Sequence, residues 1–289
     1  MQYIEAKSIL SRLKEKDTFF GIRYNMNLYR GCQHGCIYCD TRSECYGVGD
    51  ISLIRVKKNA IELLSKELSN KKKIRDTIGT GSMNDPYMPL EKELGMVRKA
   101  LQVIAENKYP THIITKSRLV VRDTDLLQEI SQKYAAVSFS ITTADDHLSK
   151  KLEPGAPKTS ERFTALENLA KKGIYTGVTL MPILPFINDT KDNLQSLLQM
   201  AKDSGASYVF PMFGVTLRKG SRDFFYQMLD TNFPGIKSKY ESHFKEQYIC
   251  DSPNYRILYN TFAELSDKLN LNTRINFYTP PPDTQLSLF

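Results

Sequence analysis

The sequence predicts an α/β fold in which six parallel strands alternate with helices and curl into a partial barrel. Short β-prone runs recur between residues 24 and 213, and segments with apolar residues three and four positions apart lie between them. Consecutive strand–helix units of this kind join parallel strands through right-handed crossovers. Eight units would close a complete barrel, and the sequence provides six, so we expect an open (β/α)6 arrangement.

The expected strands and helices follow one another along the chain. We expect strands at residues 24–28, 74–79, 112–115, 136–142, 174–180 and 208–212. We expect helices at residues 59–68, 90–106, 123–134, 160–171 and 192–204. Gly173 follows a pair of lysines, which is typical of a helix that ends in a glycine cap with cations in its last turn.

Four segments are expected. Residues 1–23 form an N-terminal extension, 24–213 the partial barrel, 214–278 a mainly helical region packed on or beside it, and 279–289 a flexible tail. The tail contains three consecutive prolines, which favour an extended linker. In such folds ligands bind at the carboxyl ends of the strands, so the residues directly after each strand are the candidate site residues.

Composition narrows the class of protein. A chain of 289 residues with 41% hydrophobic and 25% charged residues is long enough to bury a core and is neither disordered nor fibrous. The start of the chain does not resemble a signal peptide, and the longest apolar run is too short to span a membrane, so we expect a cytoplasmic protein without membrane contact. A net charge of +8 permits a polyanionic partner.

The cysteines point to metal or redox chemistry. Of five cysteines, Cys32, Cys36 and Cys39 lie within eight residues, directly after the first expected strand. Thiolates with this C-x3-C-x2-C spacing fit around one iron–sulfur cube, and Gly31 and Gly35 allow the loop to turn tightly. A [4Fe–4S] cluster ordinarily takes four cysteines, so three would leave one iron open to an exchangeable ligand.

A zinc site is the alternative. The three cysteines together with His34 or Cys45 would make a tetrahedral set. Structural zinc sites usually pair two such knuckles, and this sequence has no second C-x2-C. The spacing therefore favours the iron–sulfur cluster.

The loop, with aromatic Tyr38 directly before the last cysteine, resembles the signature of the radical SAM enzymes. The resemblance implies a radical SAM partial barrel in which Cys32, Cys36 and Cys39 hold a [4Fe–4S] cluster. It implies that S-adenosyl-L-methionine binds the open iron and is cleaved to methionine and a 5′-deoxyadenosyl radical that abstracts hydrogen from a substrate. It also implies that Tyr38 lies against the adenine and that a flavodoxin or ferredoxin supplies the electron.

Further cofactor contacts are expected at other strand ends. The resemblance implies that Gly79, Gly81 and Ser82, after the second strand, bind the methionine amino group; a plain turn is the alternative. Lys116, after the third strand, is expected to pair with the methionine carboxylate, unless it is a solvated charge. Ser140 on the fourth strand is expected to bond the ribose, with simple packing as the alternative.

Longer segments resemble the spore photoproduct lyase-like branch of the superfamily. They are residues 84–91, 115–117 and 181–189 together with the cysteine loop, and the resemblance covers most of residues 20–215. The named lyase repairs a thymine lesion in DNA and needs a cysteine after the second strand to return a hydrogen atom. Here Ser82 stands near that position, and the lyase reaction itself is not expected. Tyr87 is a substitute donor or, in the alternative, a packing residue.

Cys45 and the segment after the sixth expected strand each allow two interpretations. Cys45 is a redox thiol or a half-buried structural cysteine, and Cys250 belongs to no constellation. Basic and aromatic residues after the sixth strand either grip phosphates and stack on a base or, for the aromatics, pack in the core. They are Arg218, Lys219, Arg222, Phe224, Phe225 and Tyr226.

The last five residues resemble the pentapeptide with which bacterial replication and repair proteins bind the DNA sliding clamp. Gln285 would anchor the segment by hydrogen bonds while Leu286, Leu288 and Phe289 enter an apolar cleft. A tail strand packed on the barrel is the alternative, and the proline-rich linker favours an exposed tip.

These observations predict a bacterial radical SAM enzyme that acts on DNA, in repair or base modification, and is delivered by the sliding clamp. One alternative keeps the radical chemistry and moves it to RNA, a peptide or a small metabolite. Another is a zinc-stabilised nucleic-acid-binding module without catalysis.

Overall fold

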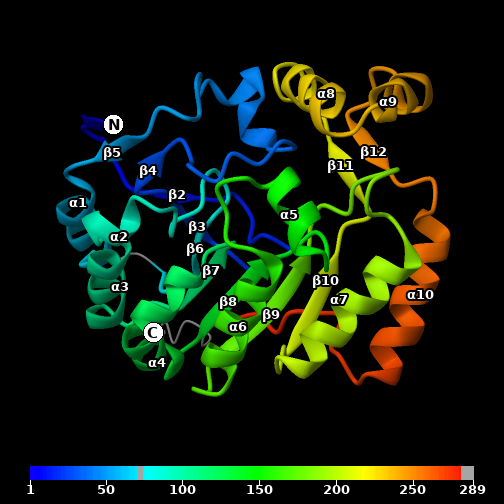
Figure 1. The fold of residues 1–289 in the computed structure, drawn as a ribbon. Helices are drawn as coiled ribbons and strands as arrows, with labels where there is room; N and C mark the ends of the chain where they lie inside the picture. The colour runs from blue at the N-terminus through cyan, green and yellow to red at the C-terminus, as the bar shows by residue number, and fades with distance from the viewer. Residues whose placement is uncertain (71–73, 281–289) are drawn as a thin grey trace, which may run out of the picture.

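The computed structural model describes residues 1–70 and 74–280, so the clamp-binding-like pentapeptide lies outside the described residues. In these ranges six parallel strands form one sheet in sequence order, which confirms the predicted α/β fold (Figure 1). They are β3 (Tyr24–Met26), β6 (Ile78–Thr80), β7 (Thr111–Thr115), β8 (Ala135–Ser140), β9 (Tyr175–Leu180) and β10 (Tyr208–Pro211).

The N-terminal segment contributes strands that were not expected. β2 (Leu10–Arg12) pairs antiparallel with β3 and extends the main sheet beyond its first parallel strand. β1 (Gln2–Ile4) joins β5 (Arg55–Lys57) and β4 (Tyr29–Arg30) in a small separate sheet. These strands are two or three residues long, too short to show an alternating pattern in the sequence.

The helices follow the expected order. α1 (Ala60–Leu68), α4 (Thr124–Ser131), α6 (Thr159–Ala170) and α7 (Lys191–Asp203) lie close to their expected ranges. Gly173 adopts a φ of +78° just beyond α6, as expected for a glycine that ends a helix.

Two expected elements are corrected. The helix expected at 90–106 is divided into α2 (Glu91–Leu94) and α3 (Met96–Glu106), because Gly95 between them has a φ of +61°. The strand expected at 74–79 begins only at Ile78, because Ile78 pairs with Tyr24, where β3 starts, and no strand lies opposite the residues before it. α5 (Asp146–Leu152) was not expected; Asp145 caps its start by accepting from the backbone N–H groups of His147 and Leu148.

Beyond the parallel strands lie β11 (Gly214–Thr216), α8 (Ser221–Asn232), α9 (Ile236–Phe244), β12 (Ile249–Asp251) and α10 (Tyr255–Lys268). β11 and β12 pair antiparallel, and α10 runs beside α7 on the outside of the barrel (Figure 1). α8 and α9 pack with Cys36, Ile37 and Tyr38 in an apolar cluster that lies beside the main core. No helix within the described residues has the length and apolar character that crossing a bilayer requires.

A buried polar chain crosses the interior of the barrel. His112 on β7 bonds through Nε2 to the Ser138 hydroxyl at 2.7 Å, and Ser138 bonds in turn to the Tyr208 hydroxyl at 2.7 Å. The Nδ1 atom of His112 lies 2.9 Å from the carbonyl oxygen of Phe20. Burial lowers the pKa of His112 to about 4, so this imidazole is neutral in the folded protein at neutral pH.

The buried His112 predicts a loss of stability in mild acid. Since the folded pKa lies below the unfolded value of about 6.5, the unfolded chain binds more protons, and stability falls as the pH drops from about 6.5 toward 4. We expect His112 to account for about 2–3 kcal/mol of the loss between pH 7 and about pH 4.5. Urea unfolding at both pH values measures it, and H112Q, which lacks the titrating group, should show a smaller loss by this amount. An identical loss in both proteins would contradict the assignment.

Candidate active site

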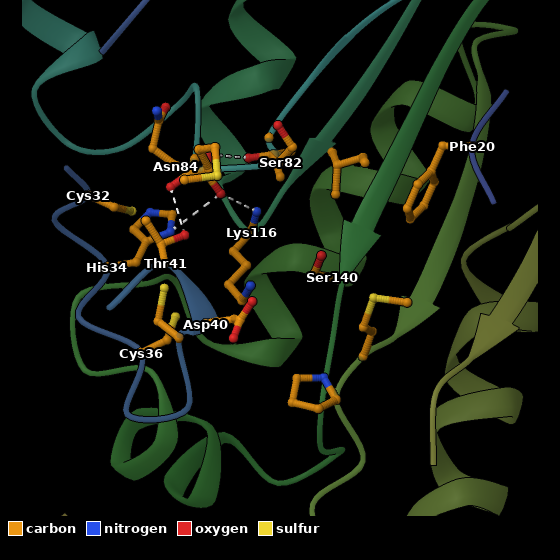
Figure 2. A pocket seen from close by; sticks show the side chains of 18 of the residues that line it. Phe20, Cys32, His34, Cys36, Asp40, Thr41, Ser82, Asn84, Lys116 and Ser140 are labelled. Atoms are coloured by element: carbon orange, nitrogen blue, oxygen red, sulfur yellow. Dashed lines mark hydrogen bonds and ion pairs between the residues drawn. The ribbon is translucent and has the colours of Figure 1, made fainter. Parts of the chain in front are cut away.

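A cavity of about 520 Å³ opens at the carboxyl ends of the parallel strands. Cys32, Cys36 and Cys39 all line it, and none is in a disulfide. Figure 2 shows Cys32, His34 and Cys36 along one side of this cavity, with Lys116 and Ser140 between them and Phe20. The fold thus places the three cysteines where α/β barrels bind their ligands.

Most of the residues expected to contact the cofactor lie in the same cavity. Tyr38, Gly81, Ser82, Lys116 and Ser140 all line it. Their contacts with S-adenosylmethionine stay predictions.

Gly79 is not among the cavity-lining residues. A Cβ atom at this position would lie 2.2 Å from the Ile22 side chain, so the glycine lets Ile22 pack directly against β6. Gly31 in the cysteine loop and Gly81 in the cavity wall are required by the backbone. Gly31 has a φ of +92° and Gly81 a φ of +95°, and a Cβ at Gly81 would lie 2.2 Å from the carbonyl oxygen of Ile114.

Asp85 fastens the cysteine loop to the end of β7. Its Oδ1 accepts from the Thr115 hydroxyl at 2.7 Å and from the Tyr87 backbone N–H at 2.9 Å. Its Oδ2 accepts from the Lys116 backbone N–H at 2.6 Å and lies 3.4 Å from Nδ1 of His34. Asp85 itself carries no sequence signal for this role, because its partners come from three separate parts of the chain.

A second buried carboxylate, Glu153, lies behind the cavity wall. Its side chain is fully buried, accepts a hydrogen bond from the Tyr38 hydroxyl, and pairs with the fully buried Arg162. The ammonium of Lys116 lies 4.0 Å from it. Arg162 also donates to the carbonyl oxygen of Ser140 at 2.9 Å, which connects this pair to the cavity wall.

The charged states of Glu153, Arg162 and Lys116 stabilise one another. Burial alone would raise the pKa of Glu153, but Arg162 and Lys116 outweigh burial and lower it. Burial alone would likewise lower the pKa of Lys116, but a thiolate at Cys36 and the carboxylate of Glu153 outweigh burial and raise it. Lys116 is therefore a cation whose side chain keeps 17% of its surface exposed. Glu153 and Arg162 carry no sequence signal, since they are isolated charges that only the folded chain brings together.

The donor set of the cavity fits an iron–sulfur cluster. Burial raises the pKa of Cys32 to about 11 and also raises the pKa of Cys36, so without metal both are thiols, and iron would displace their protons. No three His, Cys, Asp or Glu side chains in residues 1–70 and 74–280 converge as a single metal ion requires, whereas a cube binds each thiolate at a separate corner. Lys116 and Ser140 add a cation and a hydroxyl for a second ligand beside the cysteines.

Three residues for which a functional role was considered are buried and bonded or packed within the protein. Arg222 is buried, pairs with Glu246, and donates to the carbonyl oxygen of Gln247, so it does not face a ligand. Phe225 is fully buried in the cluster beside the main core, as its packing alternative predicted. Tyr87 is also fully buried and donates to Asp123 at 3.0 Å, which favours packing over hydrogen donation.

The two remaining cysteines lie outside the cavity. Cys45 is exposed rather than half-buried, and its sulfur lies 3.2 Å from a guanidinium nitrogen of Arg218. Cys250 on β12 is buried in the apolar cluster that includes residues of α8 and α9. Neither belongs to the donor set around Cys32, Cys36 and Cys39.

Removing the Glu153 carboxylate should strongly destabilise the protein. E153A leaves Arg162 buried and unpaired, and loss of one partner of a buried ion pair costs about 3–5 kcal/mol. The control is E167A, which removes a surface partner of Lys171 on α6 and should cost less than about 1 kcal/mol. Urea unfolding of anaerobically purified protein measures both, and equal small losses would show that Glu153 does not hold the site together.

Comparison with known proteins supports the cofactor assignment. The model of the Radical SAM superfamily matches residues 26–199. An uncharacterised protein of Mycobacterium tuberculosis is 30% identical over 275 residues, covering 92% of this chain and 79% of that protein. The spore photoproduct lyase of Clostridium acetobutylicum is 24% identical over 185 residues, covering 62% of this chain and 52% of that protein.

The fold agrees with these sequence relationships. A spore photoproduct lyase solved in complex with dinucleoside spore photoproduct superposes with a TM-score of 0.68, at 16% identity, over 92% of this chain and 78% of that chain. Membership of the superfamily implies a [4Fe–4S] cluster and S-adenosylmethionine, which sets the zinc alternative aside. The chain belongs to the radical SAM superfamily and is related to spore photoproduct lyase.

Proposed function

We propose that the protein is a cytoplasmic radical SAM enzyme that abstracts a hydrogen atom from DNA and modifies or repairs a base. One observation carries the radical chemistry: three free cysteines of one loop line a strand-end cavity together with the cation of Lys116. When bound, the cluster and S-adenosylmethionine supply a 5′-deoxyadenosyl radical.

The residues of the cavity have complementary roles in this proposal. Cys32, Cys36 and Cys39 hold three corners of the cluster. Lys116 pairs with the methionine carboxylate, for which its raised pKa suits it, since it stays charged at neutral pH. Gly81 and Ser82 approach the methionine amino group, and Ser140 donates to the ribose.

DNA is the favoured substrate for two reasons. A protein of the same fold binds a dinucleoside photoproduct, and this chain carries a net charge of +8, which favours association with a polyanion. The Arg42 guanidinium lies 3.6 Å from the centre of the Phe224 ring, and Arg42 directly follows Thr41, which lines the cavity. Such an arginine–aromatic pair suits a phosphate and an unstacked base.

The proposed reaction differs from that of spore photoproduct lyase in its last step, the return of a hydrogen atom to the product. All five cysteines are described, and those that line the cavity are the three cluster ligands. Ser82, which lines the cavity after the second strand, offers an O–H bond in place of a thiol. Because an alcohol is a far poorer hydrogen-atom donor than a thiol, we propose a base modification or repair reaction that does not use a cavity thiol to return hydrogen.

Transfer of a deuterium label tests the substrate class. Reconstituted, reduced protein is incubated without oxygen with S-adenosylmethionine and either fully deuterated double-stranded DNA or fully deuterated RNA. Mass spectrometry of the 5′-deoxyadenosine then identifies the source of the abstracted hydrogen. We expect deuterium in the product with DNA and none with RNA, because only the substrate that is attacked gives up hydrogen to the radical.

The matched control is C36A, which should form no 5′-deoxyadenosine with either nucleic acid because it lacks one corner ligand of the cluster. Deuterium transfer from RNA alone would replace the DNA proposal with the RNA alternative. Unlabelled 5′-deoxyadenosine with both nucleic acids would move the substrate to peptides or small metabolites. Equal product from the parent protein and C36A would remove the radical chemistry.

We further propose that the C-terminal pentapeptide binds the DNA sliding clamp. Its support is the sequence match of residues 285–289 and the proline-rich segment before it. A double variant, L288A with F289A, should lose at least about tenfold in affinity for a recombinant bacterial clamp, because two apolar anchors of the segment are removed. Fluorescence anisotropy of the full chain measures this, and equal affinity of parent and variant would exclude clamp binding by this route.

A further inference from the structure

A groove of about 440 Å³ lies on the outer side of the cysteine loop. It is formed by the segment around Pro89, the short helix η3 (Arg118–Asp123), the end of α5 with the loop that follows it, and the start of α6. His34 lines this groove and also lines the cavity that holds the three cysteines. Among the described residues, His34 is the one that lines both spaces.

The groove is strongly basic. Among the described residues that line it, Lys92, Arg118, Lys150 and Lys158 face one carboxylate, Glu161. Glu161 pairs with Arg118 at 2.7 Å. The groove therefore presents three uncompensated positive charges to an incoming partner.

The three lysines of the groove differ in their contacts. The ammonium of Lys150 donates to the carbonyl oxygens of Pro154 at 2.6 Å and Ala156 at 2.9 Å, which fixes its position without neutralising it. Lys92 and Lys158 are exposed, and no carboxylate of the described residues lies within ion-pair distance of either. These two charges are available to a partner.

His34 lies where the groove adjoins the cysteine cavity. The residue is 1% exposed, its Nδ1 faces Asp85 at 3.4 Å, and its Nε2 has no hydrogen-bond partner among the described residues. In the chain it lies between Cys32 and Cys36. The loop from Pro154 to Lys158 packs closely over it, since a Cβ atom at Gly155 would lie 2.1 Å from the Gln33 carbonyl oxygen.

We propose that this groove is the docking site of a small acidic one-electron carrier protein of the flavodoxin type, which reduces the cluster across His34. This inference rests on the proposed radical SAM function. In the step, the flavin hydroquinone of the carrier loses one electron and becomes the semiquinone, and the oxidised cluster gains that electron. No bond in the protein is made or broken.

Two physical arguments favour this partner at this place. Electron transfer slows steeply with distance, so a donor must dock close to the cluster, and the groove shares His34 with the cysteine cavity. Charge complementarity steers an acidic carrier to a basic groove and sets its orientation. A donor docked here also leaves the Arg42–Phe224 pair free for substrate, since neither residue lines the groove.

Charge reversal in the groove tests the proposal. The double variant K92E with K158E is compared with K133E with K172E, which reverses two exposed lysines that precede β8 and β9, at the opposite end of the barrel. Binding of oxidised recombinant flavodoxin to the reconstituted protein is measured by calorimetry at low ionic strength. The rate of cluster reduction by flavodoxin hydroquinone is followed by anaerobic stopped-flow absorbance.

We expect the groove variant to bind flavodoxin at least about tenfold more weakly and to be reduced correspondingly more slowly, and the control pair to stay within about twofold of the parent. Reduction by dithionite, a small reductant that needs no docking site, should be equal in all three proteins. Added salt should lower the flavodoxin affinity and the reduction rate of the parent to those of the groove variant, because salt screens the charges. Melting curves confirm that both variants are folded.

Equal flavodoxin binding and reduction in the groove variant and the control pair would overturn the proposal. A loss of DNA affinity in the groove variant with unchanged flavodoxin binding would also overturn it and assign the groove to nucleic acid. The flavodoxin measurements need neither DNA nor S-adenosylmethionine. Their result therefore remains valid if the DNA proposal fails. The deuterium experiment uses dithionite to reduce the protein, so its result remains valid if the docking proposal fails.

Discussion

Two buried carboxylates hold the cysteine loop against the strand ends. Asp85 joins His34 in that loop to Thr115 and the Lys116 backbone, and Glu153 joins Tyr38 to Arg162. A carboxylate withdrawn from water is costly unless it is paired and hydrogen-bonded, and both of these groups are surrounded by donors. The position of the loop is therefore fixed by polar contacts as well as by apolar packing.

This arrangement also sets the electrostatics of the cavity. Glu153 is compensated by Arg162 behind the wall, and it helps to keep Lys116 charged at the cavity surface. A cation that is held by a buried pair cannot turn away into solvent, so it presents a fixed binding point for a carboxylate. The three cysteines that line the same cavity supply ligands for iron, so the cavity can hold both the cluster and a carboxylate.

The parts of the molecule that the sequence predicts well are those with a local signal. Strand β8 lies in a short β-prone run of the sequence, and the cysteine loop has its ligands within eight residues, so the sequence predicts both. Glu153 and Arg162 were missed because no local pattern joins them. The division of the helix at Gly95 was missed because a single glycine is tolerated in many helices. Gly79 was assigned to the cofactor site from its place after a strand, whereas its backbone is packed against Ile22.

The central claim is that the cluster has three protein ligands and one iron reserved for S-adenosylmethionine. Electron paramagnetic resonance of the reconstituted, reduced protein, recorded before and after the cofactor is added, tests it directly. The account predicts one reduced [4Fe–4S] signal whose g-values change when the cofactor binds the open iron. A signal that is unchanged by saturating cofactor, or a protein that assembles no iron without oxygen, would contradict it.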